Sequence, residues 1–363
     1  MKVKENGITL SVQKGVFFNP NMEICRDICS LAIGAIGKKM DVCDAFCASG
    51  VRGIRYKKEN KNVGKTHFVD FSERAVECAK KNAKANGMNE CSFAKEEVSR
   101  FLLCTDSDFQ FLEIDPFGSP APYIFDACRH LSRMGKGERY LSITATDTAV
   151  LCGAEHSACV KDYMAVPLHN ELCHEAGVRI LIAYVQKMGA QFNLHLEPLF
   201  SLSALHFFKI IFRAEQDAGK SFEELQELGY LLYEQKTLER RIMGKPFACE
   251  RKEHEIVGGP FYLGRLHSEK LLLKMIKKNG KRKYAQKERI AKLLLLMKNE
   301  NSLPPFHYDL HRIADRYSLN PPKTDAVIEM LKKKGFSASR THFCPTAVKT
   351  TAGLEDVLKG MRV

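Results

Sequence analysis

The chain has 363 residues, of which 45% are hydrophobic and 27% charged, with a net charge of +13 and an isoelectric point near 9.1. This length accommodates two domains, and this composition excludes general disorder. The first eleven residues are polar and no apolar run approaches the length of a membrane span, so we expect neither a secreted nor a membrane protein. The thirteen cysteines lie scattered in apolar stretches, which is typical of free thiols in the reducing cytoplasm.

The cysteine spacing does not indicate a metal centre. Cys25 and Cys29 are separated by three residues, as are Cys43 and Cys47, whereas zinc knuckles use pairs separated by two. We therefore expect no structural metal.

The first 213 residues alternate between strand and helix patterns. Ser72 and the pair Asn86-Gly87 mark the two ends of one helix. Other segments are predicted from apolar periodicity: strands over 41–45, 66–70, 109–114 and 140–144, a long helix over 170–191, and a hairpin of 196–205 and 207–212. This alternation predicts an α/β fold with a doubly wound, mostly parallel sheet and helices on both faces.

Beyond about Arg213 the sequence changes character. Residues 214–266 read as a connecting extension with short strands, and from His267 the chain is basic and helical. Helices over 307–317 and 324–334 precede a basic, Thr-rich segment over 335–349, which is the element order of a winged helix. We predict an N-terminal domain over 1–266, with its core in about 1–213, and a mostly helical C-terminal domain over 267–363.

A single segment supplies most of the net charge. Arg265 to Glu300 contains twelve Lys or Arg residues against three Glu. Such density favours contacts with the phosphates of a nucleic acid, although a solvated helix face is the alternative. The candidate phosphate-binding side chains lie in one short run: Lys277, Lys278, Lys281, Arg282 and Lys283.

A loop of small residues after the first predicted strand indicates a cofactor site. The residues from Cys47 to Gly53, with Gly50 among them, let a ligand approach the backbone. Asp70 ends the next strand, where a carboxylate can bind both hydroxyls of a ribose. These features predict adenosine binding without deciding between NAD and S-adenosylmethionine. The strict GxGxxG is absent, and Asp44 suits a cofactor with a cationic amino acid end.

Four further residues have two interpretations each. Glu97 and Val98, between the second and third strands, can contact an adenine amino group and ring, or can form an exposed turn. Arg26 and Arg52 are, on chemistry alone, more often surface ion pairs than ligand contacts.

The run from Phe109 to Pro120 indicates a binding site for the amine of a nucleobase. Two prolines and a glycine end an apolar strand and present a carboxylate, a carbonyl and an aromatic ring in succession. Asp115 can accept one N–H of a nucleobase amine and the Pro116 carbonyl the other, while Phe117 stacks on the base. The alternative is an ordinary turn with a solvated aspartate.

Taken together, these runs resemble the tRNA (guanine-N2)-dimethyltransferase family, which modifies guanosine 26 of tRNA, and its compact archaeal members in particular. The similarity implies an N-terminal S-adenosylmethionine-dependent domain and a C-terminal domain that helps to hold tRNA. The matching runs follow the family order: 17–20 with 26–27, 44–55, 115–120, 144–147 with 151–153, 170–175, and 340–343.

The resemblance also implies residue roles. Asp115 falls on the family's catalytic acid, and the cofactor contacts fall on Arg26, Arg52, Asp70, Glu97 and Val98. Two departures stand out. Some relatives carry a four-cysteine zinc cluster after the catalytic domain, where this chain has only Cys249. Glu96-Glu97 occupies a position where relatives often have Asp, so either glutamate is a candidate for the adenine contact.

We therefore expect methylation, twice, of the N2 amine of guanosine 26 in tRNA, with S-adenosylmethionine as the donor and no metal. The target base is expected to leave its stack, with Phe17 and Phe18 forming a wall of its pocket. Two alternatives stay open: a methyltransferase for another nucleobase amine, such as adenine N6 or a different RNA guanine, and a tRNA-binding protein without catalysis.

Overall fold

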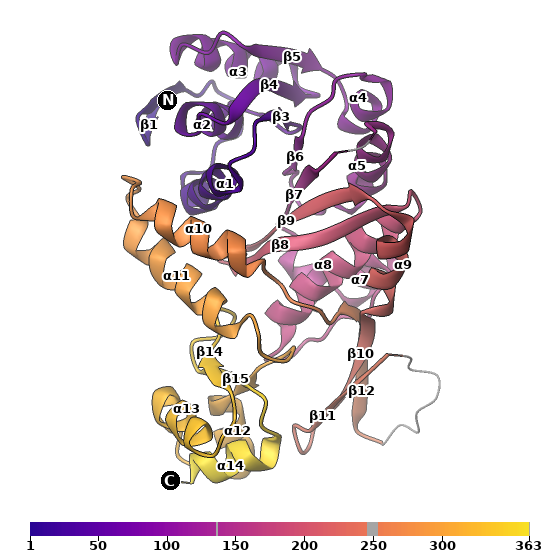
Figure 1. Ribbon diagram of the computed structural model, residues 1–363, viewed down its shortest axis with the longest axis vertical. Helices are drawn as coiled ribbons and strands as arrows, with labels where there is room; N and C mark the ends of the chain where they lie inside the picture. The colour runs from indigo at the N-terminus through magenta and orange to yellow at the C-terminus, as the bar shows by residue number, and fades with distance from the viewer. Residues whose placement is uncertain (136, 245–252, 363) are drawn as a thin grey trace.

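A seven-stranded sheet with strand order β5-β4-β3-β6-β7-β9-β8 forms the N-terminal part of the molecule (Figure 1). The computed structural model describes residues 1–135, 137–244 and 253–362. The first five of these strands are parallel, while β9 and β8 form an antiparallel edge, which is the predicted hairpin. The strands are β3 (Met40–Asp44), β4 (Val63–Asp70), β5 (Cys91–Lys95), β6 (Phe111–Ile114), β7 (Arg139–Ala145), β8 (Leu194–Ala204) and β9 (Phe207–Gln216).

Helices cover both faces of the sheet, so the predicted doubly wound architecture is confirmed. Alternate side chains of one strand enter different clusters: Val42 packs with α1 residues and Cys43 with residues of α5 and α8. The N-terminal helices and hairpin are β1 (Lys2–Glu5), β2 (Ile8–Ser11), the 3-10 turn η1 (Pro20–Met22), α1 (Glu23–Ile36), α2 (Val51–Glu59), α3 (Glu73–Ala85), α4 (Val98–Cys104), α5 (Ala121–Arg133), α6 (Thr148–Leu151), α7 (His156–Tyr163) and α8 (Cys173–Ala190).

Two predicted helices begin later than expected. The helix predicted from residue 170 begins at Cys173, and it is buried on almost every side rather than along one stripe. The helix predicted from residue 307 begins at Leu310, because Tyr308 pairs with Val348 in a small sheet and the Asp309 side chain accepts from the backbone N–H of His311 at the helix start.

The C-terminal part contains helices and two small sheets, with strand orders β11-β10-β12 and β13-β15-β14. The predicted succession of two helices and a strand pair is present as α12, α13, β14 and β15, but the sheet has a third strand because β13 pairs with β15. The elements are α9 (Ala218–Gln226), β10 (Leu228–Glu234), β11 (Arg240–Met243), β12 (Glu255–Tyr262), α10 (Glu269–Asn279), α11 (Lys287–Glu300), β13 (Tyr308–Asp309), α12 (Leu310–Tyr317), α13 (Thr324–Lys333), β14 (Ala338–Arg340), β15 (Ala347–Thr350) and α14 (Leu354–Met361).

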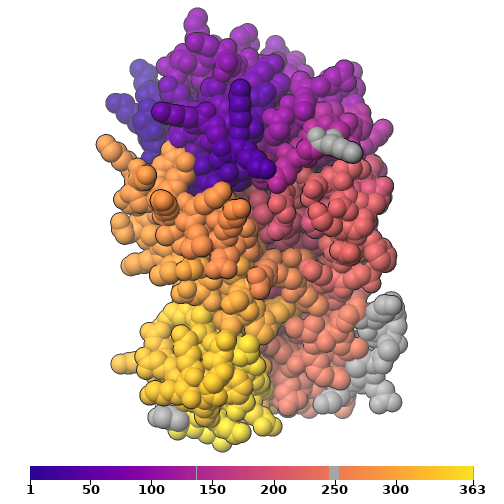
Figure 2. Space-filling view, viewed as in Figure 1, coloured from indigo at the N-terminus to yellow at the C-terminus, as the bar shows by residue number. Residues whose placement is uncertain are grey.

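Helices α10 and α11 lie against the N-terminal part of the chain. Leu272 and Leu294 share one hydrophobic cluster with Ile28 of α1, and Figure 2 shows the orange segment abutting the indigo one. The division at residue 266 therefore remains a prediction, because apolar side chains on both sides of it are buried together. Over the described residues, no helix has the length and apolar content needed to cross a bilayer.

Candidate active site

A cavity of about 290 Å³ opens at the carboxyl ends of β3, β4 and β6. The strand order reverses between β3 and β6, and ligands of doubly wound folds bind at such a point. The lining comes from the segment before α1, the loop after β3 and the residues after β4, β6 and β7: Gly15 to Asn19, Met22, Arg26, Phe46 to Ser49, Val51, Arg52, Asp70 to Ser72, Ala75, Asp115 to Phe117, and Thr146.

Asp70 forms one side of this cavity. Its Oδ2 accepts a hydrogen bond from the backbone N–H of Ala48 at 3.0 Å, and its Oδ1 accepts from that of Ser72 at 2.9 Å. These bonds fix the carboxylate, and each oxygen retains a lone pair for a ribose hydroxyl. Beside it, the buried Ser49 Oγ lines the cavity and has no partner among the described residues. A polar ligand here would satisfy that orphaned hydroxyl.

Asp44 and Gly50 fix the conformation of the loop after β3 on the side away from the cavity. Gly50 has a φ of 77°, and a Cβ there would lie 3.0 Å from the Ala79 side chain, so the turn requires glycine. Asp44 Oδ2 accepts from the backbone N–H of Gly53 at 3.0 Å, and burial raises the pKa of Asp44 to about 7. Neither Asp44 nor Gly50 is among the described residues that line the cavity.

Asp115 lies at the floor of the cavity, directly after β6, and forms an ion pair with Arg52. Burial by itself raises the pKa of Asp115, but the charges of Arg52 and Lys209 and a hydrogen bond from Thr144 outweigh it and lower the pKa. The carboxylate is therefore ionised at neutral pH and can only accept hydrogen bonds.

A buried polar network contacts Arg52. Arg52 Nη1 lies 3.4 Å from the Tyr56 hydroxyl, which donates to Glu113 Oε2 at 2.8 Å. Lys209 forms an ion pair with Glu113 and donates to Thr144 Oγ1 at 3.0 Å. Glu113 and Lys209 are not among the residues predicted from the sequence to have a role, although a charged residue inside an apolar strand pattern indicates a buried partner.

Two aromatic rings stand at the mouth of the cavity. Phe17 and Phe117 meet edge to face with centroids 4.3 Å apart, and they are 47% and 74% exposed. Phe18 lines the cavity and lies under the Arg26 guanidinium, which is 5.2 Å from the ring centroid. Exposed aromatic rings of this kind are stacking surfaces for bases.

Arg26 lines the cavity but is also held in a buried ion pair. It contacts Glu5 through Nε at 2.8 Å and Nη2 at 2.5 Å, and Nη1 donates to the Asn19 carbonyl at 3.1 Å. Arg26 and Arg52 thus both form ion pairs, but these are buried rather than the surface ion pairs that their chemistry suggested, and both arginines also line the cavity.

Glu97 and Val98 lie outside the described lining of the cavity. The Glu97 side chain caps α4 by accepting from the backbone N–H of Arg100 at 2.9 Å, and Val98 is buried. Glu96 pairs with Arg100 at 3.5 Å, although its backbone N–H donates to the Asp70 carbonyl. The adenine contact of these residues remains a prediction.

The basic run covers the last turn of α10, with Lys277 and Lys278, and the connection from α10 to α11, with Lys281, Arg282 and Lys283; we call this segment the basic turn. Lys277, Lys281 and Lys283 are exposed, and Lys278 is half-buried. Arg282 points back toward α2 and donates to the Glu59 carbonyl at 2.7 Å and to the Asn60 side chain. Of the five residues predicted to bind phosphate, Arg282 therefore attaches the turn to the N-terminal part of the chain.

The fold and the cavity define a class I methyltransferase, with an acid at the carboxyl end of β4 and the cavity at the point where the strand order reverses. A family model described as N2,N2-dimethylguanosine tRNA methyltransferase matches residues 1–362, and the chain belongs to this family.

Similar proteins extend over the full length of the chain. The tRNA (guanine(26)-N(2))-dimethyltransferase of Methanobrevibacter smithii is 35% identical, with 98% of this chain and 96% of that protein covered. The corresponding enzyme of Thermococcus kodakarensis is 36% identical, with 96% and 93% covered. A solved complex of Trm1 from Pyrococcus horikoshii with S-adenosyl-L-methionine aligns with a TM-score of 0.91 and 32% identity, covering 99% of both chains.

Proposed function

We propose that this cavity holds the N2 amine of guanine 26 of a tRNA for methylation, with Asp115, Pro116 and Phe117 as the residues that position it. The activity itself follows from the family: the chain is an S-adenosylmethionine-dependent tRNA (guanine(26)-N2)-dimethyltransferase. The observation that carries the assignment of residues is the ionised carboxylate of Asp115 on the floor of a cavity whose mouth is formed by Phe17 and Phe117.

The residues around Asp70 fit S-adenosylmethionine. Asp70 has free acceptor capacity for the ribose, and the unpartnered Ser49 hydroxyl is available to a polar group of the ligand. Arg26 and Arg52 face the same space and suit the carboxylate of the methionine end. When bound, this cofactor supplies an electrophilic methyl group on a positively charged sulfur.

The amine of guanine is a poor nucleophile because its lone pair is delocalised into the ring. Asp115 accepts one N–H and the Pro116 carbonyl accepts the other, which fixes the orientation of the nitrogen. Phe117 stacks on the base, and Phe17 braces Phe117 from the side. The nitrogen becomes acidic once it is alkylated, so the Asp115 carboxylate accepts its proton without needing to be a strong base.

The same arrangement allows a second methylation. A monomethylated amine retains one N–H, which needs one acceptor, and Asp115 supplies it. The first methyl group then lies away from Asp115, on the side of the Pro116 carbonyl. We propose that the exposed Lys277, Lys281 and Lys283, together with residues 267–363, hold the tRNA, and that the protein acts in the cytoplasm, where its substrate and its free thiols are expected.

The experiment that tests this assignment compares tRNA transcripts that differ only at position 26. With guanosine there, nucleoside mass spectrometry should detect dimethylguanosine at that position. With inosine, which lacks only the N2 amine, we expect no methylation. Methylation of the inosine transcript, or methyladenosine from an adenosine-26 transcript, would assign the cavity to a different nucleobase atom.

A further inference from the structure

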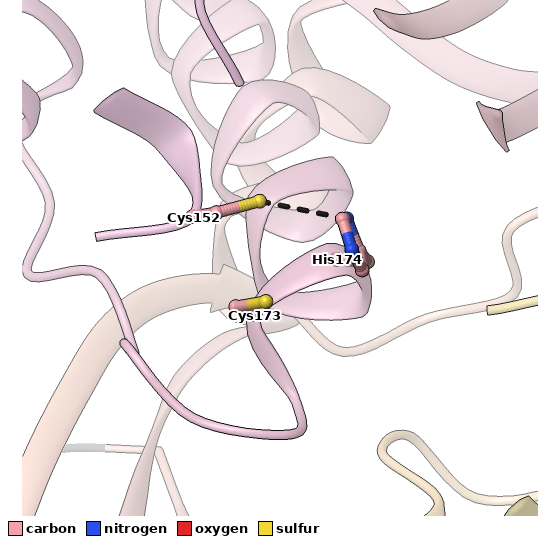
Figure 3. Close-up of side chains that lie close together, drawn as sticks. All are labelled: Cys152, Cys173 and His174. Atoms are coloured by element: carbon pink, nitrogen blue, oxygen red, sulfur yellow. Dashed lines mark hydrogen bonds between the residues drawn. The ribbon is translucent and has the colours of Figure 1, made fainter. Parts of the chain in front are cut away.

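Two cysteines and a histidine that methyl transfer does not use come together at the start of α8. Cys152 directly follows α6, and Cys173 and His174 are the first two residues of α8. Figure 3 shows the Cys152 and His174 side chains directed toward one another, with Cys173 beside them on the first turn of the helix. All three belong to sequence runs to which the proposed chemistry gives no role.

The spacing of their ligand atoms suits a tetrahedral metal. Cys152 Sγ lies 3.6 Å from His174 Nδ1, and the three ligand atoms lie within 4.8 Å of one another. Zinc binds sulfur at about 2.3 Å and nitrogen at about 2.0–2.1 Å, so two such ligands at a tetrahedral angle are roughly 3.5 Å apart. The separation of Cys152 and His174 therefore needs almost no adjustment.

The charge of the surroundings also suits thiolate ligands. A metal ion would displace the protons of Cys152 and Cys173 and bind both sulfurs as thiolates. Cys173 is the first residue of α8, so the positive end of the helix dipole lies beside these sulfurs.

We propose that Cys152, Cys173 and His174 bind one zinc ion, with a fourth coordination position open to water. His174 is exposed and both cysteines are partly buried, so an ion and a water molecule can reach the site. Thiolate and imidazole ligands select zinc over magnesium or calcium. This site differs from the CxxxC pairs seen in the sequence, and its ligands come from segments that only the fold brings together.

The ion would fasten α6 to α8. Thr146, two residues before α6, lines the cavity, and its Oγ1 accepts from the backbone N–H of Gly118 at 2.8 Å. Asp147 Oδ2 accepts from the Tyr163 hydroxyl at 2.7 Å. Holding Cys152 to the first turn of α8 would therefore limit the motion of the segment that forms one edge of the nucleobase site.

The test measures metal directly on the full chain. The protein is loaded with zinc, dialysed into metal-free buffer and analysed by elemental mass spectrometry. We expect about one zinc per chain for the wild type and for Cys104→Ser, whose cysteine is exposed on α4. Cys152→Ser and Cys173→Ser should lose this zinc, while His174→Asn should weaken its retention.

A second readout does not depend on any variant. Cobalt bound by two thiolates in a tetrahedral site gives an intense visible spectrum, which added zinc should abolish. Zinc retention by the wild type no greater than that of Cys173→Ser would overturn the proposal, as would a weak, octahedral cobalt spectrum. Loss of two titratable thiols on mild oxidation, dependent on Cys152 and Cys173 and unchanged by zinc, would identify a disulfide pair instead.

Discussion

The guanidinium of Arg52 and the carboxylate of Asp115 form an ion pair across the cavity floor, joining the start of α2 to the segment after β6. Arg52 also contacts the hydroxyl of Tyr56, which donates to the buried Glu113. Asp115 is thus fixed and charged before a substrate arrives. Under the proposed assignment the protein would accelerate the reaction by positioning, because no acceptor has to be reoriented when the amine enters.

Replacement of Asp115 by Asn should remove turnover rather than cofactor binding. We expect methyl incorporation into tRNA to fall by about 10²–10³-fold, because the neutral amide has no negative charge and cannot take the proton of the amine. The affinity for S-adenosylmethionine, measured by calorimetry, should stay nearly unchanged. Asp106→Asn, at an exposed carboxylate beyond α4, is the matched control and should behave like the wild type. Near-normal turnover of Asp115→Asn would remove this residue from the mechanism.

Replacement of Asp70 by Ala should weaken cofactor binding rather than turnover. Charge-assisted hydrogen bonds to a ribose contribute about 1.5–3 kcal/mol each, so cofactor affinity should fall by roughly a hundredfold or more. The rate at saturating cofactor should change little. Calorimetric titration with S-adenosylmethionine checks this, with the exposed Glu73→Gln as control. An unchanged dissociation constant would show that the ribose is held elsewhere.

Removing only one charge of the buried Lys209–Glu113 ion pair should destabilise the protein more than removing both charges. Lys209→Met leaves a carboxylate uncompensated in the sheet and should lower the free energy of unfolding by about 3–5 kcal/mol. The double variant Lys209→Met with Glu113→Gln should recover part of that loss, because the carboxylate that has lost its partner is then replaced by a neutral amide. Urea unfolding of the wild type and both variants measures the difference, and additive losses would contradict the expectation.

The exposed lysines of the basic turn should control the salt dependence of tRNA binding. Changing Lys277, Lys281 and Lys283 to Ala should reduce the slope of log K against log salt by about 2–3, because each phosphate contact contributes about 0.7–0.9. The matched control replaces the three exposed lysines of α3, which are Lys80, Lys81 and Lys84. Equal slopes for both triple variants would mean that the basic turn is merely solvated.

The ionisation of Glu300 should make the free energy of unfolding depend on pH. Burial alone would raise its pKa, but the charges of His342 and Lys349 and hydrogen bonds from His342 and Thr341 lower it to about 2. Because the folded pKa lies below the ordinary 4.5, the stabilisation is present above about pH 4.5 and is lost as the pH falls toward 2. Between pH 6 and pH 4, the wild type should lose about 1 kcal/mol more than Glu300→Gln in urea unfolding.

Much of the sheet could be predicted from the sequence because its signals are local. Strand patterns and the Ser72 cap each involve neighbouring residues, and the observed elements follow them. Helix α1 was not predicted, since it is buried on almost every side between the sheet and α10 and its sequence has no regular polar face.

The site was only partly predictable, because some of its contacts join residues that are distant in the sequence. Asp70 ends β4 and Asp115 directly follows β6, so the topology alone brings them to one edge of the sheet. The partners of Arg52 and Lys209 are distant in the sequence, and a pattern of residue types does not say which charges will meet. The convergence of Cys152 with Cys173 depends on the path of α6 and α7, which no spacing rule describes.

The contact of Arg282 with the end of α2 bears on how the enzyme tells one tRNA from another. Arg52 lies at the start of that helix and Glu59 at its end, so one rod of nine residues, roughly 13 Å long, connects the cavity floor to the basic turn. If the basic turn binds a phosphate as proposed, the distance between that phosphate and the reacting base is fixed by the length of α2. A tRNA with a nucleotide inserted between those two points would present its guanine out of register, and the enzyme would act as a gauge of substrate shape.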